Sequence, residues 1–165
     1  MDIQLFLMNL KRLESETAKL YDELAELSRR RFPELCLFLL DLADEERGHE
    51  SYVDSLRRLL GSLEITERTD EEQEELDFSL FFDRLERARL SFQQKRETFL
   101  PKEIVEEIVS LESSLVERHA LLLSERFELP QEVQRLLTAL VSFDRGHVEK
   151  IKARAVRFGL SFQSE

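Results

Sequence analysis

Apolar residues recur at alternating steps of four and three along residues 3–30, the spacing of a helix face that packs in a bundle. The members of this apolar stripe are Ile3, Leu7, Leu10, Glu14, Thr17, Tyr21 and Leu24. Glu14 lies on the stripe, whereas Glu16 and Glu23 do not. The pattern therefore predicts a helix over residues 2–31 that carries one carboxylate on its inward face.

A second stripe with the same spacing follows Pro33, a residue that suits the first turn of a helix. It consists of Leu35, Leu39, Leu42, Glu46, His49, Val53, Leu56 and Leu60, and Gly61 is a natural stop. The second helix is thus expected over residues 33–60. Glu46 and His49 occupy two consecutive positions of an otherwise aliphatic stripe, and burying them is costly unless something compensates their polarity.

Two more helices are expected over residues 101–127 and 130–158, each opened by a proline. Their stripes are Val105, Ile108, Glu112, Leu115, His119 and Leu122, and then Val133, Leu137, Leu140, Asp144, His147, Ile151 and Phe158. The intervening residues 62–100 hold an acidic run and then an apolar-rich segment that indicates a crossover helix at about 78–97. We therefore predict one all-α domain, a four-helix bundle with a long, partly helical crossover.

The two halves of the chain match at an offset of 98 residues without a gap. The corresponding pairs include Glu14 and Glu112, Glu46 and Asp144, His49 and His147, and Gly61 and Gly159. Residues 10–61 and 108–159 share 11 identities in 52 positions, a small number that gains weight because it includes the polar stripe positions and their neighbours. The sequence thus presents two matching half-sites.

Six metal-binding side chains fall on the four inward stripes. In each half, one helix supplies a Glu and the next supplies a carboxylate three residues before a histidine, which places both on one face. The candidate ligands are Glu14, Glu46, His49, Glu112, Asp144 and His147. Carboxylates and imidazoles suit a pair of divalent first-row metals, with iron or manganese favoured over zinc, and this arrangement is typical of ferritin-like di-iron and di-manganese proteins. Either half-site taken alone would favour a different interpretation, in which a buried histidine has its hydrogen bonds satisfied by the protein and the nearby carboxylate lies at the surface.

On these residues the sequence resembles the ferritin-like superfamily, and within it the rubrerythrin-like branch, over the four helices but not the crossover. The resemblance implies two bound iron ions, with manganese or a mixed pair as alternatives, and a homodimer. It implies a di-iron oxidoreductase of the peroxidase or ferroxidase type, which oxidises ferrous iron and reduces peroxide or oxygen with an external electron donor. It also implies that Tyr21 lies beside the ligands as a hydrogen-bond partner. We expect the same role for His119, its counterpart in the second half, with an additional metal ligand as the alternative.

Three departures from the rubrerythrin pattern keep other hypotheses open. Asp144 replaces the usual Glu and is one methylene shorter, and Leu115 stands where rubrerythrins carry a further Glu tied to peroxide chemistry. The rubredoxin-like module is missing, since the chain has a single cysteine, Cys36. The second hypothesis is a non-catalytic iron carrier or sensor. The third is a metal-free helical scaffold whose polar stripe is held by Glu–His hydrogen bonds.

The amino-acid composition further limits the class of protein and its expected location. Four Gly and three Pro in 165 residues are typical of a mostly helical chain, and the net charge of −11 disfavours nucleic acid, which attracts basic surfaces. No apolar run is long enough for a membrane span, no signal-peptide pattern opens the chain, and the lone Cys36 excludes an internal disulfide. A cytoplasmic location is expected, with Cys36 as a small buried apolar residue.

Two repeated residue pairs beside the histidines complete the predictions. Gly48 and Gly146 lie inside helices, where glycine costs about 1 kcal/mol relative to alanine. We expect a neighbouring group to need that space, with inheritance from a duplicated ancestor as the alternative. Arg47 and Arg145 are expected to reach outward to surface carboxylates.

Overall fold

The computed structural model describes residues 2–61, 66–67, 77–115 and 127–160, without the side chains of residues 114–115, 140–141 and 143–145. The helices in this part of the chain are α1 (Ile3–Ser28), α2 (Pro33–Leu60), α3 (Phe78–Gln94), α4 (Pro101–Leu115), α6 (Gln131–Ala155) and the short 3₁₀ helix η1 (Val156–Phe158). Two strands of two residues, β1 (Thr66–Glu67) and β2 (Phe127–Glu128), pair antiparallel. The predicted all-α class is confirmed.

The helices begin where the sequence satisfies or removes the free N–H groups of a first turn. Asp2 caps α1 by accepting hydrogen bonds from the backbone N–H groups of residues 4 and 5, at 2.8 and 3.2 Å. Asp77 caps α3 by accepting from the N–H two residues later, at 2.9 Å. Pro33 and Pro101 are the first residues of α2 and α4, where a missing N–H costs nothing.

The two glycines predicted as helix stops end their helices in different ways. Gly159 follows η1 with φ 85°, a left-handed conformation that favours glycine. Gly61 caps α2 with φ −67°, an ordinary right-handed value, and its N–H donates to the carbonyl of Arg57 at 2.9 Å. A left-handed turn therefore requires glycine at Gly159 only.

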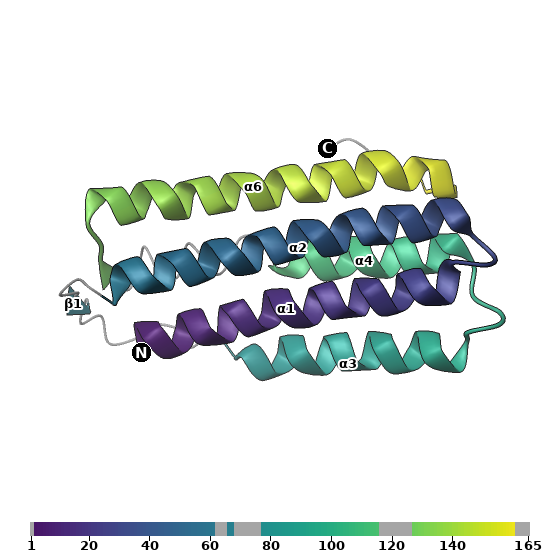
Figure 1. Cartoon of the computed structure of the whole chain (residues 1–165), viewed down its shortest axis with the longest axis horizontal. Coiled ribbons are helices and arrows are strands. Elements are labelled where there is room, and N and C mark those ends of the chain that lie inside the picture. Colours follow the sequence, from purple (N-terminus) through teal and green to yellow (C-terminus); the bar gives the residue numbers. More distant parts are fainter. Residues whose placement is uncertain (1, 62–65, 68–76, 116–126, 161–165) are drawn as a thin grey trace.

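The long helices of the described residues lie alongside one another with their axes roughly aligned (Figure 1); they are α1, α2, α3, α4 and α6. Helix α1 packs along α2 and α3, and α6 packs against both α2 and α4. The aliphatic stripe positions that are at most 2% exposed on α1 and α2 are Leu7, Leu10, Leu24, Leu35, Leu39, Leu42, Val53, Leu56 and Leu60. The predicted inward faces are confirmed, and Glu46, on the same stripe, is also only 2% exposed.

The crossover contains α3, which ends at Gln94, somewhat before the predicted end near residue 97. Its buried residues include Phe78 and Phe92, and the Phe78 ring meets the ring of Phe6 on α1 edge-on at 5.3 Å between centroids. Because α3 contacts both α1 and α4, it joins the two halves of the chain. The acidic run ahead of it lies outside the described residues.

The secondary structure at Phe127 differs from the predicted helix. The third helix was expected to extend to Phe127, but this residue lies in β2 and pairs with Glu67 of β1. Its side chain is 4% exposed, so it is buried and its backbone belongs to a strand pair. A contact with a segment 60 residues away in the sequence thus overrides the local helical pattern.

The surroundings of Gly48 and Gly146 contradict the expectation that a neighbouring group needs the space beside these glycines. Within the part of the chain that the structure describes, a Cβ atom placed on either residue would meet no heavy atom of a neighbouring group within 4 Å, so no group there needs the space. Gly48 lies two residues after the buried Glu46, about 200° around the helix, which turns it toward solvent. By contrast, Arg47 reaches the surface carboxylates of Asp44, at 2.7 Å, and Asp22, as predicted.

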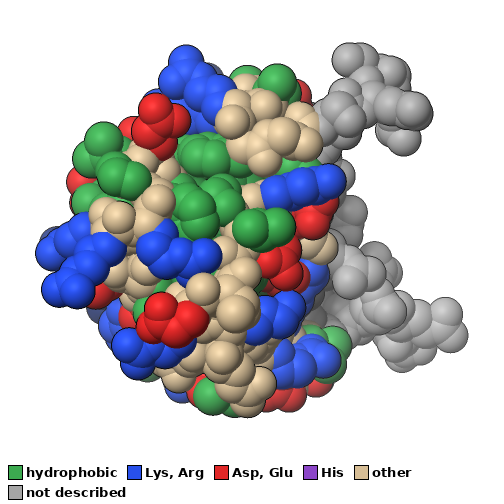
Figure 2. Space-filling model, turned by 90° about the vertical axis from the view of Figure 1, so that its right-hand side faces the viewer, with side chains coloured by type: hydrophobic (Ala, Val, Ile, Leu, Met, Phe, Trp, Pro, Cys, Tyr) green, Lys and Arg blue, Asp and Glu red, His purple; other side chains and the backbone are tan. Residues whose placement is uncertain are grey.

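The end of the molecule where α1 turns into α2 and α6 finishes carries apolar side chains bordered by charged ones (Figure 2). Exposed large apolar residues of the segments near this end include Leu37, Leu100 and Val156.

The remaining predictions about single residues have these outcomes. Cys36 is buried, as predicted, and the side chain of Arg145 lies outside the described part of the structure. Among the described helices none combines the length and apolar character that crossing a membrane requires.

Candidate metal centre

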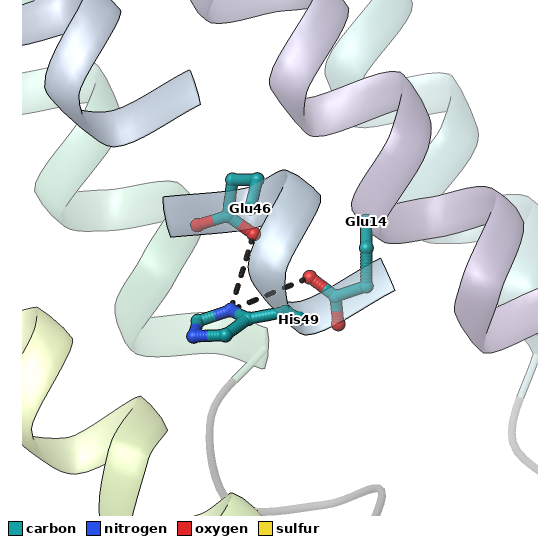
Figure 3. A group of neighbouring side chains, drawn as sticks. All are labelled: Glu14, Glu46 and His49. Carbon is teal, nitrogen blue, oxygen red and sulfur yellow. Dashed lines mark ion pairs between the residues drawn. The ribbon is translucent and has the colours of Figure 1, made fainter. Parts of the chain in front are cut away.

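Three candidate ligands meet between α1 and α2. The i, i+3 spacing of Glu46 and His49 puts both on the face of α2 that packs against α1, and Glu14 faces them from α1 (Figure 3). The Nδ1 atom of His49 lies 3.5 Å from Oε2 of Glu46 and 3.8 Å from Oε2 of Glu14. One ligand atom from each residue lies within 4.8 Å of the other two. One cation between them could therefore contact all three side chains.

A second group forms between α2, α4 and α6. The Nε2 atom of His147 lies 3.1 Å from Oε1 of Glu46 and 3.6 Å from Oε1 of Glu112. These three residues also offer ligand atoms within 4.8 Å of one another. They are only 2–5% exposed, so this group lies deeper than the first, where the side chains of Glu14 and His49 are 19% and 17% exposed.

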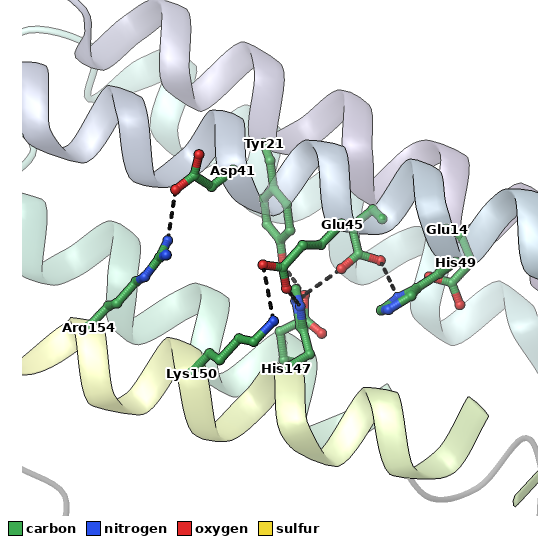
Figure 4. A network of polar contacts seen from close by, with 10 residues as sticks. Glu14, Tyr21, Asp41, Glu45, His49, His147, Lys150 and Arg154 are labelled. Carbon is green, nitrogen blue, oxygen red and sulfur yellow. Dashed lines mark hydrogen bonds and ion pairs between the residues drawn. The ribbon is translucent and has the colours of Figure 1, made fainter. Parts of the chain in front are cut away.

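Glu46 belongs to both groups and joins them. Its Oε2 atom faces His49 and its Oε1 atom faces His147, and the two imidazole rings are 5.5 Å apart between centroids. The polar network therefore runs through the interior from α1 across α2 to α6 (Figure 4). A carboxylate with one oxygen toward each of two groups is well placed to bridge two cations.

Tyr21 contacts a candidate ligand directly. Its side chain is completely buried, and its hydroxyl donates a hydrogen bond to Oε1 of Glu112. Burial, followed by the charges of Glu112 and Glu46, raises the pKa of Tyr21 well above its usual value, so the hydroxyl keeps its proton. Tyr21 therefore lies in direct hydrogen-bond contact with one candidate ligand.

Glu45 contacts the candidate ligand His147, although it does not lie on the apolar stripe of its helix. Its Oε2 atom lies 2.7 Å from Nδ1 of His147, and since a carboxylate accepts, Nδ1–H is the donor. Glu45 is adjacent in sequence to Glu46 but lies off the inward stripe, among many surface carboxylates. No signal in the sequence separates it from those, because the contact depends on how closely α6 approaches α2.

The pKa values of the two buried carboxylates, Glu46 and Glu112, are shifted in opposite directions. Burial would raise the pKa of Glu46, but the two neighbouring imidazoles outweigh it and lower that pKa far below its usual value. Burial, and then repulsion from Glu46, raises the pKa of Glu112. Burial would lower the pKa of His147, but Glu112 and Glu46 raise it to about 11. One proton on His147 thus balances part of the carboxylate charge in the metal-free protein.

The donor set fits a metal because the protein's own hydrogen bonds leave part of it unsatisfied. Among the described residues, three buried side-chain atoms have no hydrogen-bond partner: Nε of Arg57, outside the site, and Oε1 of Glu46 and Nε2 of His147, which face each other as an ion pair at 3.1 Å. Such atoms are rare in folded proteins, and a bound ion is one of the explanations for them. No Lys or Arg in the described residues forms an ion pair with Glu46 or Glu112. A divalent cation would supply the missing partner and the missing positive charge.

The structure brings five of the six sequence candidates together: Glu14, Glu46, His49, Glu112 and His147. The sixth, Asp144, belongs to α6, but its side chain lies outside the description. His119, the proposed counterpart of Tyr21, lies outside the described residues as well. The assignments of Asp144 and His119 stay predictions.

Comparison with known proteins adds no assignment. The chain matches no protein-family model, no curated protein and no solved structure. What the site can do is therefore inferred from its own geometry and chemistry.

Proposed function

We propose that this protein is a di-iron carboxylate protein of the ferritin-like, rubrerythrin-like type, which oxidises ferrous iron and reduces peroxide or oxygen. The observation that carries the proposal is the pair of carboxylate–histidine groups joined through Glu46, with Oε1 of Glu46 and Nε2 of His147 left without hydrogen bonds. In this assignment α1, α2, α4 and α6 form the four-helix bundle, and α3 belongs to its crossover.

Each residue has a distinct task in this proposal. Glu14 and His49 would hold one metal position, Glu112 and His147 would hold the other, and Glu46 would serve both. Tyr21 restrains the Glu112 carboxylate by its hydrogen bond, which limits the positions that the side chain adopts. Asp144 is the predicted remaining ligand.

The surrounding helices supply the conditions for such a centre. The side chains of Glu46, Glu112 and His147 are almost completely removed from water, which strengthens their electrostatic interaction with any bound cation. Two iron ions held there would supply electrons to peroxide or oxygen as they pass from the ferrous to the ferric state. The single cysteine provides no rubredoxin-like centre to return those electrons, so an external donor belongs to the proposal. A homodimer is the assembly we propose by the same resemblance.

A metal-free scaffold is less well supported by the site. Hydrogen bonds from Tyr21 to Glu112 and from His147 to Glu45 do stabilise the network without a metal. They leave Oε1 of Glu46 with an ion pair to His147 at 3.1 Å but no hydrogen bond, and no Lys or Arg of the described residues pairs with Glu46 or Glu112.

A non-catalytic iron carrier or sensor remains the second candidate. Leu115 stands where rubrerythrins have a further carboxylate, so a group tied to their peroxide chemistry is missing from this chain. Repeated turnover separates the two candidates, since a carrier would bind ferrous iron without consuming peroxide in proportion to an added reductant.

The test begins with metal content and anaerobic ferrous titration of the purified chain, followed by a pulse of peroxide monitored by absorbance. We expect two metals per chain and a near-ultraviolet band that disappears on reduction and returns with more peroxide. E112Q should lose one metal. E106Q is the matched control, because Glu106 is an exposed carboxylate on the same helix, paired with Lys102 at 3.6 Å.

The outcomes are separable. Two metals without an oxidisable band would favour the carrier or sensor. Failure to bind any metal, or retention of two metals by E112Q, would contradict the proposed centre.

A further inference from the structure

We propose that Glu45 is a positioning residue that fixes the ring of His147 and thereby controls the affinity of one metal position only. The inference rests on the proposed function, because it concerns how the same site holds its metal. It assigns a role to a residue that is neither a candidate ligand nor part of the inward stripe of α2.

The contact defines which nitrogen of His147 faces the carboxylates. Nδ1–H donates to Glu45 at 2.7 Å, which leaves Nε2 on the opposite edge of the ring toward Glu46 and Glu112 (Figure 4). Histidines that bind metals commonly donate their second ring N–H to a carboxylate, which fixes the tautomer and the ring orientation and makes the ligating nitrogen more basic. The geometry around His147 satisfies this requirement before any metal binds.

Glu45 differs in its surroundings from the ligands it supports. Its side chain is 30% exposed, and its other oxygen, Oε1, lies 3.5 Å from the ammonium group of Lys150 on α6. A half-buried carboxylate that receives an imidazole N–H on one oxygen and faces a lysine on the other has few orientations available. The His147 ring, which is 3% exposed, is therefore held from the surface side by Glu45.

The support reaches only one of the two positions. His49 uses the other nitrogen, since its Nδ1 atom faces Glu14 and Glu46. At the 98-residue offset, moreover, the position equivalent to Glu45 is Phe143, a residue type without a hydrogen-bond acceptor on its side chain. The two half-sites thus match in their candidate ligands, but Glu45 has no counterpart at the same offset.

A purely structural role for Glu45 makes a different prediction. In that case the contact would only tie α2 to α6, as Arg154 does by pairing with Asp41 at 2.9 Å, one turn earlier on α2. D41N therefore provides a matched control: it removes the same charge from the same helix and breaks a link to the same partner helix. It leaves every contact of His147 in place.

The experiment titrates cobalt(II) into the metal-free chain and follows the ligand-field absorption in competition with a chelator. For the unaltered protein we expect two equivalents with separate dissociation constants. E45A should raise the dissociation constant of one equivalent by about 10- to 100-fold and leave the other unchanged. E45Q, which keeps an acceptor but not the charge, should lose less. D41N should match the unaltered protein.

Two further measurements connect the effect to His147. H147A should abolish the equivalent that E45A weakens, and the double variant should show no additional loss, because Glu45 acts through that ring. Nuclear magnetic resonance of the metal-free protein labelled with ¹⁵N-histidine should show a protected Nδ1–H proton for His147 that is absent in E45A. This signal reports ring orientation without a metal.

The results that overturn the inference are distinct from those that overturn the proposed function. If E45A binds both equivalents as the unaltered protein does, weakens both equally, or behaves like D41N, Glu45 has no positioning role. If the unaltered chain binds no cobalt(II), the proposed metal centre fails and this inference fails with it.

Discussion

Tyr21→Phe tests the buried network most directly, because it removes one oxygen and leaves the ring and its packing in place. The lost interaction is the hydrogen bond from the Tyr21 hydroxyl to Glu112, and both side chains are buried. A hydrogen bond to a charged group contributes about 1.5–3 kcal/mol. For a chain of this length, a loss of about 2 kcal/mol should lower the melting temperature by about 4–8 °C.

Tyr52→Phe is the internal comparison. The Tyr52 hydroxyl donates to the backbone carbonyl of Leu136 at 2.8 Å, at a partly exposed position. A hydrogen bond between neutral groups contributes about 0.5–1.5 kcal/mol. Guanidinium unfolding of both variants in a chelator, followed by far-ultraviolet circular dichroism, should therefore show the larger loss of unfolding free energy for Y21F.

The dependence on pH gives a second check on the same variant. Burial and Glu46 raise the pKa of Glu112, and the Tyr21 hydroxyl lowers it, because it stabilises the charged carboxylate. The destabilisation by Y21F should therefore be complete above the folded-state pKa of Glu112 and fade as the pH falls through it. If Y21F costs no more than Y52F at neutral pH, the Glu112 carboxylate does not depend on Tyr21 and our account of the network is wrong.

Three other predictions follow from the same structure. Burial lowers the pKa of His147, but Glu112 and Glu46 outweigh it and raise this pKa to about 11, so a metal that binds His147 must displace a proton. The apparent affinity for cobalt(II) should therefore rise about tenfold per pH unit near neutrality for each proton released. An affinity that does not change with pH would contradict this. A ferrous or cobalt(II) concentration about 100 times the dissociation constant should stabilise the chain by about 2.7 kcal/mol in anaerobic thermal unfolding, and E46Q should abolish most of this gain while E106Q keeps it. G48A should stabilise the metal-free protein by about 1 kcal/mol in guanidinium unfolding, because a methyl group there meets open space; a loss of stability would mean that the backbone at Gly48 has to move.

Periodicity was a reliable guide to the helices and their inward faces. Leu35, Leu39 and Leu42 recur at helical spacing, and all three are buried as the pattern predicts. The same periodicity selected Glu46 from a helix rich in carboxylates, because only a carboxylate on the stripe must enter the core. The pattern failed at Phe127, where pairing with β1 depends on a segment far away in the sequence.

The sequence by itself determined which side chains face the interior, since a helix repeats every 3.6 residues and places every third or fourth side chain on one face. Together with the 98-residue offset, this selected Glu14, Glu46, His49, Glu112, Asp144 and His147 as a group, of which the structure describes all side chains except that of Asp144. Only the tertiary structure decided that Glu46 faces both histidines, that His49 and His147 present different nitrogens, and that Glu45 contacts the second ring. These features depend on the distances and rotations between helices and on side-chain torsions, which the spacing along one helix does not determine.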